Sequence, residues 1–208
     1  MGDIYSSADL VRDDKGRVYI NENGEVQAVR DIKGVENWTK LGSVLPKANL
    51  AWKNDFNYKG ISLGFLITAR LGGVVFSRSQ ATFDYYGVSE ASANARDRGG
   101  VMVDGTMVNA YNWYNVVASS DGIPQFYTYS ATNVRLQEAS IGYTFPRKWT
   151  RICDATVSLI GRNLLMIYKK GPYDPDSVAS TTDNFYQGVD YFMTPSTRNI
   201  GFSVRLKF

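Results

Sequence analysis

Residues 196–208, at the carboxy-terminal end of the sequence, alternate between apolar and polar positions without a break. Successive side chains of a strand point to opposite sides of its sheet, so this alternation predicts a strand with two different faces. One face is wholly apolar, with Ile200, Phe202, Val204, Leu206 and Phe208. The other is small or charged, with Asn199, Gly201, Ser203, Arg205 and Lys207. One wet face and one apolar face are typical of a transmembrane β-barrel strand.

The same period of two recurs in four earlier segments, which are residues 46–58, 61–80, 134–145 and 154–166. In residues 134–145 it holds in the second half of the segment. Lys59-Gly60 is a two-residue turn signal between the first two, and only PRKWTRICD connects the last two. We therefore expect two β-hairpins. Gly72-Gly73 should interrupt the second strand, which can resume at Val74.

Two long segments remain, residues 81–133 and 167–195, and both are rich in Gly, Asn, Asp, Ser and Tyr. Because no helical period competes with the period of two, we expect an all-β chain and interpret both segments as loops. Such long loops are unusual in compact soluble domains, but they are normal on the outer side of a membrane barrel, whose periplasmic turns are short. The strands would then make five passes. Ahead of them, residues 4–20 predict an exposed hairpin around Asp14-Lys15-Gly16.

Composition narrows the class of protein. The net charge of +3 offers no basic field for nucleic acid, and the absence of histidine removes the commonest metal ligand and general base. Cys153 has no partner cysteine and is expected to be a small buried or turn residue. No apolar run approaches the roughly 20 residues of a membrane helix, and no signal peptide is recognisable, so we expect part of a larger exported protein.

Several short segments of the sequence are informative when their order and spacing are considered together. They are GDIY, DKGRVYINENGE, LGSVLPKANLAWKNDFNYKGISLGFLITARLGG, VRLQEASIGYTFP, ATVSLIGRNLLMI, YDPDS and the final RLKF. In order and spacing, along nearly the whole chain, they resemble the carboxy-terminal part of the SusC/RagA family of TonB-dependent outer-membrane transporters.

The resemblance implies a fold. It is an antiparallel up-and-down transmembrane β-barrel of about 22 strands with a plugged lumen. Residues 46–208 would supply the last five strands, with long extracellular loops at 81–133 and 167–195. Residues 1–45 would form an extracellular loop or hairpin region, and the plug domain and the TonB-contacting segment would be absent from this chain.

The resemblance also implies a function. The full-length parent would import glycans or peptides across the outer membrane of a Gram-negative cell, with a SusD-like lipoprotein and the TonB complex as partners. Outer-membrane lipid and the barrel assembly machinery would be further partners, and Phe208 would belong to the assembly signal. The competing interpretation of Phe208 is an aromatic residue at the membrane interface. No enzymatic activity, cofactor or nucleic-acid partner is implied.

Aromatic side chains are concentrated in the segment 81–133. Flat rings stack on sugars and peptide groups, so they are candidates for ligand or partner contact. Packing of the segment on itself is the competing interpretation, and the more favoured one. The candidates are Tyr111, Trp113, Tyr114, Tyr127 and Tyr129, with Phe126 beside them.

Charged side chains in the long segments suggest no specific chemistry. Asp174, Asp176, Asp183 and Asp190 lack the spacing of a calcium-binding loop, and YDPDS is interpreted as a turn fixed by Pro175. The run Arg96-Asp97-Arg98 is expected to form a solvated salt-bridge network. No metal site is predicted.

Two other classes of function stay open at this point. A secreted or surface β-sandwich could use the same aromatic residues as a carbohydrate-binding module. A hydrolase on a β scaffold is disfavoured by the missing histidine, and no nucleophile, base and orienting group can be assembled from the sequence.

Overall fold

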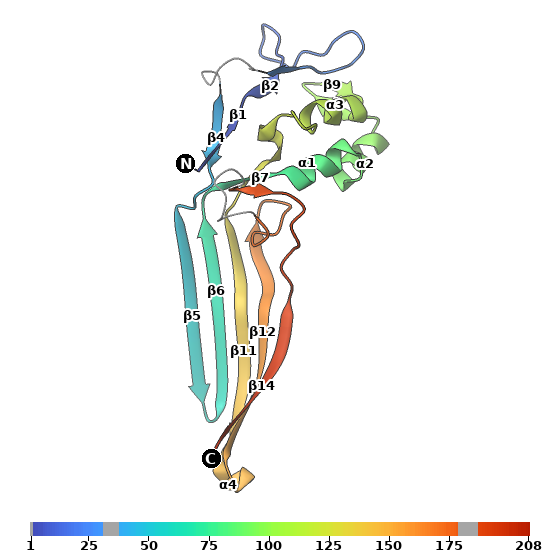
Figure 1. The fold of residues 1–208 in the computed structure, drawn as a ribbon. Coiled ribbons are helices and arrows are strands. Elements are labelled where there is room, and N and C mark those ends of the chain that lie inside the picture. Colours follow the sequence, from blue (N-terminus) through green and yellow to red (C-terminus); the bar gives the residue numbers. More distant parts are fainter. Residues whose placement is uncertain (1, 31–37, 179–186) are drawn as a thin grey trace.

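The computed structural model describes residues 2–30, 38–178 and 187–208. Its largest unit is a five-stranded antiparallel sheet in the order β14-β12-β11-β6-β5 (Figure 1). The strands are β5 (Ala48–Tyr58), β6 (Ile61–Leu71), β11 (Asn133–Phe145), β12 (Asp154–Lys169) and β14 (Asn199–Lys207). The five predicted strands and both predicted hairpins are therefore confirmed, with each strand beside the neighbour that an up-and-down arrangement requires.

Both short connections lie at one end of this sheet. Lys59 and Gly60 have φ values of 47° and 87°, the left-handed pair that a tight hairpin turn needs. A one-turn helix, α4 (Arg147–Thr150), forms half of the connection between β11 and β12. Figure 1 shows α4 and the last residue at the lower end of the sheet, which we call the short-turn end. The opposite end is the long-loop end.

The strand predicted for residues 61–80 stops early. Gly72 and Gly73 have φ values of 78° and 84°, a conformation that ends a regular strand. The chain resumes as β7 (Val74–Ser77), but β7 belongs to a separate three-stranded sheet with β10 (Thr128–Ser130) and β13 (Val189–Asp190). The interruption and a strand that resumes at Val74 are therefore confirmed, but the extension of the same membrane strand to residue 80 was wrong, because β7 pairs in another sheet and α1 begins at Arg78.

Helices follow β7, so the expectation of an all-β chain was wrong here. They are α1 (Arg78–Tyr85), α2 (Glu90–Asp97) and α3 (Ala110–Val117), with a hairpin of β8 (Val101–Val103) and β9 (Thr106–Val108) and a 3₁₀ turn, η2 (Pro124–Tyr127). Each α-helix has eight residues, too few to display a helical period. The signals that were available are the N-caps, Ser77, Ser89 and Asn109, whose side chains accept backbone hydrogen bonds. We call residues 74–132 the helical cap.

The N-terminal residues form short ribbons beside the cap. β1 (Asp3–Ser6) pairs with β4 (Thr39–Ser43), and β2 (Ala8–Leu10) pairs with β3 (Ala28–Arg30). The predicted turn is present, because the Gly16 N–H donates to the Asp13 carbonyl and Arg12 bridges to Val18. The strand partner was predicted wrongly for residues 4–10, which pair with later segments instead of with residues 17–20.

The hydrophobic core lies in the cap and the N-terminal ribbons. Leu10 and Val26 from the ribbons pack with Val108, Val117 and Ile123 of the cap. Among the residues that the structure describes, no buried hydrophobic side chain belongs to the five-stranded sheet. The sheet and the cap therefore differ in how they shield apolar surface.

Candidate functional site

One face of the five-stranded sheet is apolar from edge to edge. The pairing register aligns side chains into rows across the strands, and one such row is Phe202, Leu159, Ile141, Leu63 and Phe56. All five are exposed, and Phe202 reaches 81%. The register thus converts five separate alternations into a continuous apolar surface.

The opposite face is small and polar. The neighbouring row on that side is Ser203, Ser158, Gly142, Ser62 and Asn57. Cross-strand polar contacts hold it together: Arg162 Nε donates to Glu138 Oε2 at 3.0 Å, and the Thr144 and Thr156 hydroxyls lie 3.0 Å apart. This face suits contact with water or with polar protein groups.

The apolar face has no protein cover in the described part of the chain. An uncovered apolar surface spanning five strands is unfavourable in water but matches the hydrocarbon of a bilayer. Aromatic rings stand at the short-turn end of this face: the rings of Tyr143 and Phe145 are 4.9 Å apart, and Trp149 is 6.3 Å from Phe145. Such rings are typical of the membrane–water interface. The arrangement favours a membrane-facing sheet.

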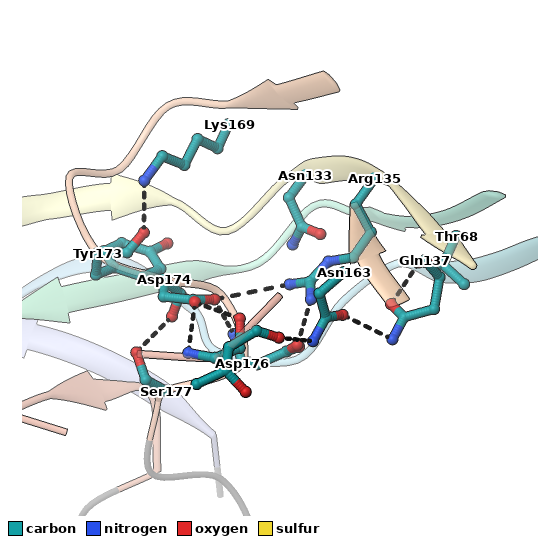
Figure 2. Close-up of polar contacts among 12 residues, drawn as sticks. Thr68, Asn133, Arg135, Gln137, Asn163, Lys169, Tyr173, Asp174, Asp176 and Ser177 are labelled. Carbon is teal, nitrogen blue, oxygen red and sulfur yellow. Dashed lines mark hydrogen bonds and ion pairs between the residues drawn. The ribbon is translucent and has the colours of Figure 1, made fainter. Parts of the chain in front are cut away.

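A polar cluster lies at the other end of the sheet, where Figure 2 shows Arg135 between two carboxylates. The Arg135 side chain, 5% exposed, pairs with Asp176 through Nη1 and with Asp174 through Nη2, at 3.8 Å for the latter. Asp174 also accepts hydrogen bonds from the backbone N–H of Ser196 at 2.8 Å and from its hydroxyl. We call Arg135, Asp174, Asp176 and Ser196 the polar junction.

The polar junction ties three distant parts of the chain together. Arg135 is at the start of β11, Asp174 and Asp176 lie in the YDPDS turn, and Ser196 precedes β14. Burial raises the pKa of Asp174, but hydrogen bonds from Ser196 and the Asp176 N–H and the charge of Arg135 outweigh it and lower that pKa below its usual value. The junction therefore favours an ionised Asp174.

Two further contacts anchor the YDPDS turn. Lys169 Nζ donates to the Tyr173 carbonyl at 3.2 Å (Figure 2), and the Tyr173 hydroxyl donates to the Ser130 carbonyl at 3.3 Å. Burial and the nearby Asp190 raise the pKa of Tyr173 to about 12 against the opposing charge of Arg70. YDPDS is thus a turn, as predicted, and its residues connect the cap to the long-loop end of the sheet through hydrogen bonds.

The pairing of β11 with β12 is irregular beside the polar junction, and each strand contributes one irregular residue. The β11 register shifts around Gln137, and opposite it Asn163 has a φ of 52°. Gln137 Nε2 donates to Asn163 Oδ1 at 3.1 Å, and Asn163 Nδ2 donates to the Thr197 carbonyl at 3.1 Å. Asn is among the residues that tolerate this left-handed conformation, so GRNLL carries a bulge that links β12 to the segment before β14.

The five aromatic candidates do not form one site. Tyr127 is buried, and its hydroxyl donates to Asp84 Oδ2 at 2.9 Å. Burial together with the Asp84 charge raises the pKa of Tyr127 well above its usual value. Trp113 and Tyr114 are half-buried against the cap core, with the Trp113 ring edge-on to Phe126 at 5.4 Å.

The other two aromatic candidates lie in different surroundings. Tyr111 is 74% exposed on α3. Tyr129 is half-buried, like Trp113 and Tyr114, but it lines a shallow hollow of about 730 Å³ between α1, α2 and residues 170–172. Tyr111 through its exposure and Tyr129 through the hollow are therefore placed for contact with a ligand or partner.

The remaining candidates have structural partners or lie outside the described residues. Asp190 accepts from the Ser77 hydroxyl at 2.6 Å, and Asp183 is outside the described residues. Arg96 Nη1 donates to the Gly87 carbonyl at 2.7 Å, and no ion pair among described residues involves the run 96–98, so a salt-bridge network was the wrong prediction. Cys153 is buried just before β12, as expected.

Metal sites and membrane helices were both sought in the described ranges. Within residues 2–30, 38–178 and 187–208, no group of three or more His, Cys, Asp or Glu side chains could hold a metal ion. In those same ranges no helix has the length and apolar character needed to cross a membrane.

Comparison with known proteins gives matches in sequence and in fold. No family model matches the chain. TonB-dependent receptor P3 of Formosa agariphila is 23% identical over 182 residues, which cover 81% of this chain and 17% of that receptor.

Three solved structures share the fold over 99% of this chain. Two show the RagAB peptide importer in its closed-closed and open-open states, with TM-scores of 0.62 and 0.66 at 18% identity. The third, of the RagAB peptide transporter, has a TM-score of 0.68 at 17% identity. This chain spans only 22–23% of those chains.

These matches agree with the two-faced sheet and with the motifs that carried the sequence resemblance. In sequence the chain is similar to a segment of a TonB-dependent receptor, and in fold it is similar to part of the RagAB transporter.

Proposed function

We propose that this chain supplies five membrane strands to the barrel of an outer-membrane importer driven by TonB. The observation that carries the proposal is the apolar face of the sheet, which spans all five strands without protein cover in the described residues. The importer would work by gated passage of its substrate and not by catalysis.

The orientation follows from the unequal connections. Outer-membrane barrels have short periplasmic turns and long outer loops. The short-turn end would therefore face the periplasm, and residues 1–45, 81–133 and 167–195 would lie outside the cell. In this arrangement the helical cap and the polar junction stand at the extracellular mouth, and residues 46–208 contain the membrane strands.

The substrate class is a bulky nutrient, either a glycan or a peptide, delivered with a SusD-like lipoprotein over the mouth. The RagAB structures, described as a peptide importer, support the peptide alternative. Tyr111 and Tyr129 are the cap residues that we expect to contact substrate or lipoprotein, because the Tyr111 side chain is exposed and Tyr129 lines the hollow. Trp113, Tyr114 and Tyr127 would support that surface from beneath.

Phe208 has a separate proposed role. It follows β14 and is 82% exposed at the short-turn end. We propose that the barrel assembly machinery reads this terminal aromatic residue, so removing it should lower the amount of assembled protein without changing transport per molecule.

The β-sandwich alternative needs a second sheet packed on the apolar face. The largest sheet is a single layer in the described part of the chain, and its apolar side chains are exposed. No observation therefore favours the carbohydrate-binding module.

Uptake by the full-length protein tests the proposal. Cells carrying the full-length gene, and cells in which the region for residues 46–208 is deleted, would be given labelled oligopeptides and labelled oligosaccharides. We expect uptake of one class only, lost on deletion and lost equally when TonB is inactivated. Recovery of the full-length protein in the soluble fraction, or uptake that persists without TonB, would contradict the proposal.

A further inference from the structure

The short-turn end of the sheet carries an excess of positive charge. Residues 58–61, 145–155 and 205–208 hold six cationic side chains, Lys59, Arg147, Lys148, Arg151, Arg205 and Lys207. Asp154 is the one acidic side chain among these residues, and it already accepts a hydrogen bond from the Arg147 N–H at 2.8 Å. The cations therefore greatly outnumber the acids at this end.

The cations on the two turns are exposed beside aromatic rings. Lys59 lies in the β5–β6 turn with its Nζ 5.2 Å from the Tyr58 ring, and Lys148 and Arg151 are exposed around α4. Trp149, between them in sequence, is 63% exposed and lies near Phe145 at the rim of the apolar face. Positive charge and aromatic rings thus meet where the apolar face ends.

The exposure of α4 does not result from a position at the edge of the sheet. It connects β11 to β12, and β11 has β6 on its other side while β12 has β14. Strands described here therefore flank α4 on both sides, and Figure 1 shows it projecting beyond the end of the sheet. No ion pair among the described residues involves Lys148 or Arg151, and Trp149 is largely exposed.

We propose that the short-turn end is a binding surface for the headgroups of anionic phospholipids. The proposal rests on the proposed membrane location of the sheet. Trp and Tyr rings settle at headgroup level, and cationic side chains at the same level attract anionic lipid. The long stems of Lys and Arg let their charges reach the headgroups from the edge of the apolar face. Charge complementarity and continuity with the apolar face favour lipid over a protein partner.

The test measures lipid selectivity at the perimeter of the full-length protein in a bilayer. Spin-labelled phosphatidylglycerol and spin-labelled phosphatidylcholine would be compared by the fraction of each that the protein immobilises. We expect the anionic lipid to be preferred by about threefold or more at low salt, with the preference falling as salt rises.

A triple variant removes the turn cations while keeping the backbone. Lys59→Asn retains a residue that favours the left-handed turn before Gly60, and Arg151→Asn suits the φ of 64° at that position. With Lys148→Gln added, we expect the preference to fall close to one. The single variant Lys148→Gln, which leaves both turns unchanged, should show a smaller fall in the same direction.

A matched control removes three exposed cations at the other end of the molecule, with Lys15→Gln, Arg98→Gln and Lys170→Gln. It should keep the full preference. Equal preference for both lipids in the unmodified protein, or an undiminished preference in the triple variant, would overturn the proposal and point to a protein partner for the cluster. Absence of any immobilised lipid of either kind would instead overturn the membrane location itself.

Discussion

The helical cap and the five-stranded sheet treat the same kind of side chain in opposite ways. Ile123 of the cap is 1% exposed and packs among Val117 and Tyr127, whereas Ile141 of the sheet is 54% exposed and its cross-strand neighbours Leu63 and Leu159 are exposed as well. The cap is built like a soluble domain, with a buried core. The sheet has its apolar surface on the outside.

This contrast agrees with the proposal that the two regions face different solvents. A chain exposed to water throughout would need a second layer of structure over the apolar face of the sheet. The polar junction and Gly72-Gly73 lie at the boundary, where the regular strands end and the cap begins. The predictions that follow probe each region with the full-length protein in a bilayer.

The largest effect is expected from matched truncations of one residue type. Ile123→Ala should leave a cavity and lower the free energy of unfolding of the cap by about 2–5 kcal/mol. Ile141→Ala should cost much less, since lipid chains can occupy the vacated volume. Hydrogen exchange of residues 110–127, compared with that of β11, measures both effects. Equal costs would mean that the sheet also packs against protein.

The second-largest effect on stability is expected when a positive charge is introduced on each face of β14 in turn. Ile200→Lys places a cation on the apolar face near mid-sheet and should cost about 2–4 kcal/mol in assembled stability. Gly201→Lys points to the other side, where a Cβ would meet nothing within 4 Å, and should be far milder. Denaturant unfolding of the assembled protein compares the two. Similar costs would remove the distinction between the faces.

A substitution at the boundary between the cap and the sheet should cause a smaller loss of stability. Arg135→Met removes the cation between Asp174 and Asp176, and we expect about 1–3 kcal/mol of local destabilisation because a partly buried carboxylate loses its partner. Arg135→Lys should restore part of it. Faster proteolysis within residues 170–178, with the cap and strands still protected, is the expected signature. Loss of the whole fold would mean that the junction is not local.

Acid should weaken the same junction. The pKa of Asp174 is lowered from 3.8 in the folded protein, so its ionised form contributes stability above that value, and this stability is lost as the pH falls through the lowered pKa. A spin label at position 195 should become more mobile as the pH falls through that lowered pKa. Asp174→Asn should abolish the pH dependence. A mobility that is independent of pH in the unmodified protein would contradict the assignment.

The sheet was predictable because its signal is local and repeated. In β14 every second side chain is apolar, in β5 the same alternation has Asn54 as its one exception, and the turn residues Lys59-Gly60 mark the hairpin in the sequence itself. The bulge at Gln137 was visible only as a flaw in the alternation of residues 134–145. The position of the short-turn end and of its aromatic rings could be predicted from the residues at which the strands end.

The cap and the junction were not predictable in the same way. Each helix is two turns long, so its capping residue was the only available signal, and in residues 81–133 the abundance of turn-forming residues outweighed it. Arg135 pairs with Asp176, which lies 41 residues away in the sequence, and neither VRLQ nor YDPDS contains a signal that predicts this contact. Likewise, whether Tyr127 or Tyr111 is exposed depends on tertiary packing and not on either residue's neighbours in sequence.

The central claim is that the sheet faces lipid on one side, and single spin labels along Asn199–Lys207 test it most directly. With Cys153 replaced by Ser, each position would be labelled in turn in the full-length protein, and its collision rates with oxygen and with a water-soluble nickel complex would be measured in a bilayer. The account predicts oxygen maxima at positions 200, 202, 204 and 206, with nickel access following the opposite phase or staying low throughout. A profile without a period of two in oxygen access, or nickel maxima at those four positions, would contradict it.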